Sequence, residues 1–182
     1  MPLQPPVVPD FRAGVYEHGV DLNTSLRDAL GFLTARCVFK ARQTTTQSIA
    51  SGTWTAITFQ AIDEDPYGGW SNTHPERYVA QIPGTYLASG LVAHGGTTVA
   101  NTTGLAGIGF DQALASGGVI TPSTEQTASL DGNAWGIPAA WTIYLGVGDY
   151  LTIAGYQSSG GALSTNVGTG LQSALDVYWI SA

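Results

Sequence analysis

Residues 77–92, RYVAQIPGTYLASGLV, constrain the fold of this chain more than any other stretch. On both sides of Pro83-Gly84, apolar residues alternate with polar or small ones, which is the period of a β-strand. Proline presets the first torsion of a tight turn, and glycine supplies the positive φ that a type II turn requires next. The stretch therefore predicts two short strands joined by a turn. Because two paired strands are not stable alone, the rest of the chain must provide a facing sheet.

The composition indicates many short strands with tight turns. Charged residues make up only 10% of the 182 residues, against roughly 25% in an average soluble domain, while 24 residues are glycine. Hydrophobic residues at 43% and aromatic residues at 10% argue against disorder. A chain of this length is sufficient for one domain with a substantial core.

The charge balance excludes two classes of partner. The formal net charge is −7, whereas a nucleic-acid binder needs a basic surface to replace the counterions on phosphate. An anionic membrane surface is disfavoured for the same reason.

The first ten residues, MPLQPPVVPD, do not have the pattern of a signal peptide, and no run of about 18 apolar residues occurs. The single cysteine, Cys37, allows no intrachain disulfide framework.

The N-terminal part of the chain differs from the rest. Residues 1–20 contain four of the nine prolines, so we expect an extended arm that docks against a sister subunit or a larger assembly. Residues 21–35 predict a short amphipathic helix, because leucines recur at spacings of four, four and three. The apolar stripe of this docking helix consists of Leu22, Leu26, Leu30 and Leu33. Residues 36–182 are then expected to form the β-sandwich.

Two later stretches predict strands with assigned faces. In residues 149–157, Leu151 and Ile153 fall on one face, while Tyr156 falls on the other. The closing stretch, residues 175–180, carries bulky side chains on both faces. Leu175, Val177 and Trp179 share one of these faces, and Asp176, Tyr178 and Ile180 share the other. Since only one face of a sandwich strand meets the core, Tyr178 and Ile180 require a second partner. We predict a subunit interface there and include Tyr156 among its candidate residues.

Residues 61–75 predict a loop that admits several interpretations. Its acidic residues Asp63, Glu64 and Asp65 are either solvated or weak candidates for a calcium site made of carboxylate oxygens. Its aromatic residues Tyr67 and Trp70 either cap one end of the sandwich or stack on a sugar ring.

The sequence contains no constellation typical of an enzyme. His18, His74 and His94 are scattered and lack the HExxH spacing of a metal site, and no serine lies in a G-x-S-x-G motif. We therefore expect neither catalysis nor a bound cofactor or metal, apart from the weak calcium candidates above.

Several motifs together resemble one protein family. Besides the Pro-Gly stretch at 77–92, three further segments match. They are QTTTQSI running into TWTAITF (43–59), LGVGDYL through QSSGG (145–161), and LDVYWI (175–180). These segments resemble C1q/TNF-like jelly-roll domains. Within residues 22–33, a pattern of the form LN-x-x-LRD-x-L-x-FL resembles the N-terminal stretch of tailed-phage accessory virion proteins that carry such a domain. Residues 93–141 are the least readable part of the chain, because glycines punctuate short apolar runs and the strands cannot be aligned.

The resemblance implies an all-β, C1q/TNF-like jelly-roll sandwich that forms a homotrimer. It also implies a non-enzymatic structural or adhesive protein of the phage virion, assembled in the bacterial cytoplasm and bound to other virion proteins. A minor tail protein and a capsid decoration protein both fit this description. The alternative is a module that recognises a glycan on the host surface through Tyr67 and Trp70.

Overall fold

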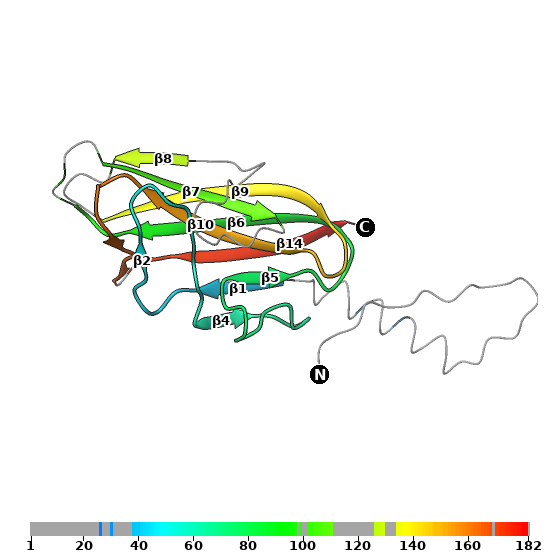
Figure 1. Cartoon of the computed structure of the whole chain (residues 1–182). Helices are drawn as coiled ribbons and strands as arrows, with labels where there is room; N and C mark the ends of the chain where they lie inside the picture. Colours follow the sequence, from blue (N-terminus) through cyan, green and yellow to red (C-terminus); the bar gives the residue numbers. More distant parts are fainter. Residues whose placement is uncertain are drawn as a thin grey trace, which may run out of the picture.

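The computed structural model of the chain describes Leu26, Leu30 and residues 38–97, 99, 102–110, 126–129, 134–168 and 170–181. From residue 38 onward, the described residues form a sandwich of two layers of antiparallel strands (Figure 1). The strands are β1 (Val38–Arg42), β2 (Ser48–Ile49), β3 (Thr55–Ala56), β4 (Ala61–Glu64), β5 (Arg77–Val79), β6 (Gly84–His94), β7 (Thr103–Phe110), β8 (Gln126–Ser129), β9 (Trp135–Leu145), β10 (Tyr150–Gln157), β11 (Leu163–Ser164), β12 (Val167–Gly168), β13 (Leu171–Gln172) and β14 (Ala174–Ser181).

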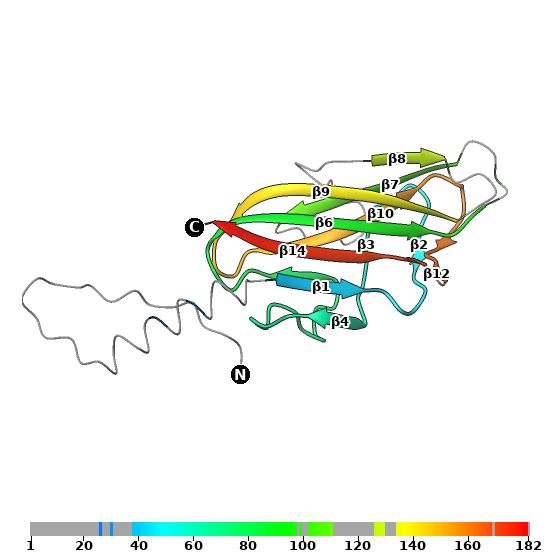
Figure 2. The ribbon, with the colours of Figure 1, turned by 180° about the vertical axis from the view of Figure 1, so that it is seen from behind.

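The two layers are five-stranded sheets, named here after a central strand of each. The β14 sheet has the order β4-β1-β14-β6-β9. The β10 sheet has the order β3-β10-β7-β8, and β5 also pairs with β10. Figure 2 shows the β14 sheet in front of the β10 sheet. Neighbouring strands such as β1, β14 and β6 are far apart in sequence, so the fold is held by long-range pairings.

The core lies between the two sheets and is built around aromatic rings. Phe39 stacks on Tyr78 with ring centroids 4.9 Å apart, and Tyr78 lies 6.3 Å from Tyr86. The buried Tyr86 hydroxyl donates a 2.6 Å hydrogen bond to the carbonyl oxygen of Ile82. Fully burying one large apolar side chain contributes about 1.5 to 3 kcal/mol, so the packing of these side chains between the two sheets stabilises the fold. Leu151 and Ile153 are buried on one face of β10, Leu175 and Val177 on one face of β14, and Ile57 and Phe59 are buried as well.

The prediction of a hairpin at Pro83-Gly84 was wrong. Both flanking segments are strands with the expected buried faces, but β5 lies in the β10 sheet and β6 in the β14 sheet. The chain therefore crosses between sheets here. Gly84 has φ +147°, and an added Cβ would lie 2.3 Å from the carbonyl oxygen of Ser181. Close backbone approach, and not a type II turn, is what requires this glycine.

The structure adds strands where the sequence predicted none. Residues 61–64 form β4, which pairs with β1, so the acidic stretch begins in a strand and not in a loop. The unreadable residues 93–141 contain β7, β8 and most of β9. β9 pairs with β6 along its whole length and forms one edge of the β14 sheet.

The predicted arm, residues 1–20, lies outside the described residues, as do Leu22, Leu33 and Cys37. Of the predicted docking helix, Leu26 and Leu30 are described. Both are helical, and more than half of each side chain is exposed. In the part of the chain that the structure describes, no helix has the length and apolar character needed to cross a membrane.

Candidate functional site

The candidate functional site is the outer face of the β14 sheet, which points away from the core. Because residues alternate in a strand, it carries the side chains between the buried ones. From β1 and β14 these are Val38, Lys40, Arg42, Ala174, Asp176, Tyr178 and Ile180, and from β6 and β9 they are Thr85, Leu87, Ser89, Leu91, Pro138, Ala140, Thr142 and Tyr144. We call this set the outer face.

One end of the outer face is apolar. Tyr178 lies opposite Val38 on β1 and opposite Leu87 on β6, so these side chains form one row across three strands. Leu87 is 37% exposed, Ile180 52% and Tyr144 62%. This exposed apolar area runs across the sheet from β1 to the edge strand β9, and such an area is typical of a surface that another molecule covers.

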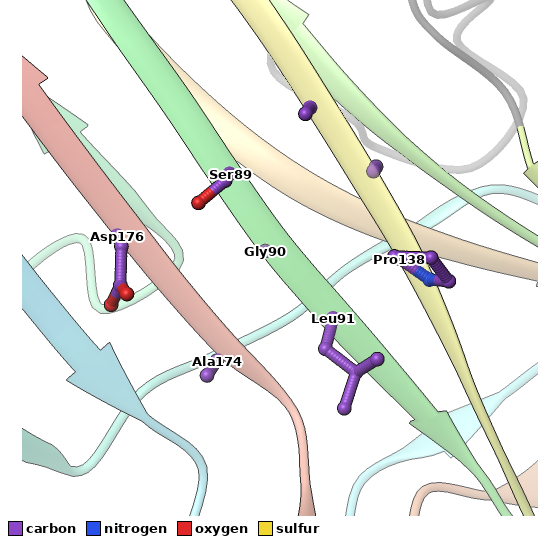
Figure 3. A pocket seen from close by; sticks show the side chains of 8 residues that line it. Ser89, Gly90, Leu91, Pro138, Ala174 and Asp176 are labelled. Carbon is purple, nitrogen blue, oxygen red and sulfur yellow. The ribbon is translucent and has the colours of Figure 1, made fainter.

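A shallow hollow lies in the other part of the outer face (Figure 3). It is lined by Ser89, Gly90, Leu91, Pro138, Ala139, Ala140, Ala174 and Asp176. The hollow exists because β6, β9 and β14 place small side chains in adjacent positions, for example Ala140 opposite Ser89. Figure 3 shows Asp176, Ser89 and Pro138 on three strands around the hollow.

A charged row crosses the β14 sheet from β4 to β6 next to the apolar end, and its members Asp176 and Ser89 also line the hollow. Glu64, Lys40, Asp176 and Ser89 are consecutive cross-strand partners on β4, β1, β14 and β6. The Lys40 Nζ lies 2.7 Å from Glu64, and this contact is the main reason that the pKa of Lys40 is raised. Beside the row, the Arg42 Nε lies 3.0 Å from Asp63.

Asp176 is the least compensated charge in this row. Its half-buried carboxylate accepts only a long 3.5 Å contact from the Tyr178 hydroxyl, and among the described residues no cationic nitrogen lies within 4.0 Å of it. Burial raises the pKa of Asp176, and the more distant charge of Lys40 opposes that shift.

The predicted interface residues divide between two surfaces. Tyr178 lies on the outer face opposite Leu87, as the two-sided pattern of its strand indicated, while Ile180 lies at the register shift between Trp179 and Ser181 and is exposed. Tyr156 lies on β10, in the opposite sheet, where its ring centroid is 5.6 Å from that of Trp54. Tyr156 therefore lies apart from the surface of Tyr178 and Ile180, because its strand pairs within the β10 sheet, and its part in a subunit interface stays a prediction.

The three acidic residues at 63–65 have separate structural roles. Asp63 and Glu64 form the ion pairs with Arg42 and Lys40. The Asp65 carboxylate accepts two 2.9 Å hydrogen bonds, from the backbone N–H groups of Gly69 and Trp70. No group of three or more metal-ligating side chains occurs among the described residues, so the geometry does not support the calcium candidates.

Tyr67 and Trp70 do not form a platform for a sugar ring. Tyr67 is only 2% exposed and belongs to the core, while Trp70 packs against it and donates its Nε1–H to the carbonyl oxygen of Pro75 at 3.4 Å. The two hydrogen bonds to Asp65 fold the loop back onto the sandwich, where Tyr67 is buried and Trp70 is partly buried. Stacking of a sugar ring on Tyr67 and Trp70 does not fit this geometry. The other interpretation, that the two rings cap one end of the sandwich, does fit.

Sequence reasoning missed several residues of the outer face. The alternation of Leu87, Ser89 and Leu91 with core residues was visible, and it could have identified a second apolar strand beside Tyr178. Tyr144 and the hollow could not have been found, because they depend on the pairing of β9 with β6.

The polar groups inside the sandwich are structural. The imidazole of His94 is buried, and its Nε2 lies 3.1 Å from the carbonyl oxygen of Leu105, which can only accept. Burial lowers the pKa of the His94 imidazole, and the hydrogen bond to Leu105 opposes that shift.

Comparisons with known proteins agree with this fold. No protein-family model matches the sequence, and no curated protein matches it. Solved structures do match. The globular domain of zebrafish complement 1qA has a TM-score of 0.57 and 11% identity, covering 80% of this chain and 98% of that domain. Murine APRIL at pH 5.0 has a TM-score of 0.55 and 14% identity, covering 79% and 98%. Eiger TNF from S. frugiperda has a TM-score of 0.54 and 10% identity, covering 81% and 95%.

The matched regions cover almost the whole of these three structures and most of this chain. At such low identity they define the fold alone, which is the C1q/TNF-like jelly roll. The prediction of an all-β, C1q/TNF-like sandwich is confirmed.

Proposed function

We propose that this chain is a non-enzymatic structural protein that forms a homotrimer through the outer face of the β14 sheet. The observation that carries the proposal is the exposed apolar area around Tyr178, Leu87, Ile180 and Tyr144. The outer face of a sandwich sheet normally meets water and is polar. Since about a third to a half of Leu87 and Ile180 is still exposed, covering them contributes roughly 0.5 to 1.5 kcal/mol for each side chain.

Association through the face is favoured over association through the edges of the sheet. β9 carries Pro138, which has no N–H to donate to a further strand. β4, at the other edge, carries the paired charges Asp63 and Glu64. Proline and charge are both devices that prevent edge-to-edge pairing. A closed three-fold assembly, which the family resemblance implies, would bury the outer face of every copy.

We place this trimer in the virion of a tailed phage, as a minor tail protein or a capsid decoration protein. The support is the LN-x-x-LRD-x-L-x-FL pattern in residues 22–33 and the acidic sequence with a single cysteine. Leu26 and Leu30 are helical and largely exposed, which suits a segment that docks on another virion protein. The sandwich would then be displayed outward with a structural or adhesive role.

The trimer is tested by changing the apolar end of the outer face. The double variant Tyr178→Asp, Ile180→Asp should sediment as a monomer or aggregate, whereas the parent chain sediments as a trimer. Val147→Asp is the matched control, because Val147 is 66% exposed in the turn between β9 and β10 and lies off the outer face. A trimer mass for the double variant, or a monomeric parent chain, refutes the assignment.

The virion role is tested by deleting residues 1–20. The deletion should leave the sandwich folded, as judged by its thermal unfolding transition, and abolish incorporation into particles. Normal incorporation contradicts docking through the arm. Labelling of the full chain on intact particles then separates a position on the tail from one on the capsid.

A further inference from the structure

The charged row on the outer face carries one more negative charge than positive charge. It contains two carboxylates, Glu64 and Asp176, and one ammonium group, Lys40, while the adjacent Arg42 and Asp63 neutralise each other. Lys40 lies between the two carboxylates and contacts Glu64 at 2.7 Å. Its Nζ also lies 5.9 Å from the centroid of the Tyr178 ring. The surplus charge therefore resides on Asp176.

Asp176 stands at the rim of the hollow, where a neighbouring copy would exclude water. The floor beside it consists of Gly90, Ala139 and Ala174, which offer no side-chain donor. Ser89, its partner across β6, is the nearest polar side chain on that strand. In the free chain, solvent reaches the carboxylate through the open hollow. Covering the hollow removes that solvent, and an ionised carboxylate without a partner is costly to bury.

A second copy of the described sandwich has no unpaired cation to place against Asp176. Lys40 and Arg42 have partners on their own sheet. The third described cation, Arg77, lies 4.5 Å from the Tyr150 ring and 3.6 Å from Glu76. A trimer would also bring three copies of Asp176 into one assembly, and like charges favour protonation of a carboxylate.

We infer that association through the outer face takes up a proton at Asp176, so that the trimer is favoured as the pH falls. This inference rests on the proposed function. The groups that face Asp176 are Lys40 and Arg42 from β1, Asp63 and Glu64 from β4, and Tyr178 from its own strand. Of these, the two other carboxylates each have their own cation, so Asp176 is the one that accepts the proton.

The sign of the pH dependence follows from linkage. The trimer binds the proton more tightly than the free chain does, because covering the hollow adds to a burial that already raises the pKa of Asp176. The association constant therefore rises as the pH falls through the interval between the trimer pKa and the free-chain pKa. Within that interval the rise is about tenfold per pH unit for each proton taken up.

The test is sedimentation velocity on the full chain from about pH 8 to about pH 5, at concentrations where monomer and trimer coexist. The parent chain should become more trimeric as the pH falls. Asp176→Asn, which mimics the protonated acid, should be trimeric at every pH and lose the slope. Asp63→Asn is the matched control and should keep it. Thermal unfolding of each variant at high pH shows whether the sandwich is intact.

Three results overturn the inference: a parent trimer whose association constant does not change with pH, a trimer that weakens in acid, or an unchanged slope in Asp176→Asn. A trimer that weakens in acid would show that the neighbouring copy supplies a cation to Asp176. Failure of the proposed function is distinguishable, because it appears as a monomeric parent chain at every pH or as an unaffected Tyr178→Asp, Ile180→Asp variant.

Discussion

Replacing Asp65 tests whether its carboxylate stabilises the loop that follows β4. Its carboxylate accepts hydrogen bonds of 2.9 Å from the N–H groups of Gly69 and Trp70, and the Gly69 backbone is buried. In Asp65→Ala both donors lose their partner. A hydrogen bond to a charged group contributes about 1.5 to 3 kcal/mol, and partial exposure of Asp65 reduces that figure. We expect the free energy of unfolding to fall by about 2 to 3 kcal/mol.

The assay is urea unfolding followed by tryptophan fluorescence, since Trp70 lies in the affected loop. For a domain of this size, a loss of about 2 kcal/mol lowers the midpoint of thermal unfolding by roughly 4 to 8 °C. Asp63→Ala is the matched control, because an exposed ion pair contributes about 1 kcal/mol at most. A loss below about 0.5 kcal/mol in Asp65→Ala refutes the structural role. Stabilisation of the parent chain by calcium, absent in Asp65→Ala, would instead establish Asp65 as a ligand.

Two further predictions concern the inside of the sandwich. Burial lowers the pKa of His94, so the unfolded chain binds a proton at this residue more tightly than the folded chain does. The free energy of unfolding should therefore decrease as the pH falls from about 6.5 to the folded-state pKa. Replacing His94 with Leu should remove this part of the pH dependence of urea unfolding, and an unchanged profile would contradict it. Gly84→Ala should cost more than about 2 kcal/mol, because its Cβ would lie 2.3 Å from the backbone of Ser181. Gly52→Ala, at φ +74° in open space, is the control and should cost only about 1 kcal/mol.

The alternation of apolar residues was sufficient to predict the strands whose inward positions are large. β10 and β14 are examples, since Leu151, Ile153, Leu175 and Val177 mark their buried faces. β7 was missed because its inward positions include Gly104 and Ala106, which give little contrast with their neighbours. The hairpin error has a different cause. A period of two identifies a strand and its buried face, but it does not say which sheet the strand joins.

The candidate site could be predicted only in part for the same reason. Tyr178 and Ile180 were identified because a strand with bulky residues on both faces needs two partners. Their neighbours Leu87 and Tyr144 come from β6 and β9, and only the register of those strands places them beside β14. The charged row likewise joins Glu64, Lys40 and Asp176 from three separate parts of the chain.

The position of β14 between β1 and β6 has a consequence for biosynthesis. Both neighbours leave the ribosome well before β14 does, so each exposes an unpaired backbone edge until the missing strand arrives. Strand insertion between distant segments is slow, and unpaired edges are where nascent chains pair wrongly. We expect the middle of the β14 sheet to be the last part to acquire protection from amide hydrogen exchange, and chains shortened before β14 to aggregate during translation.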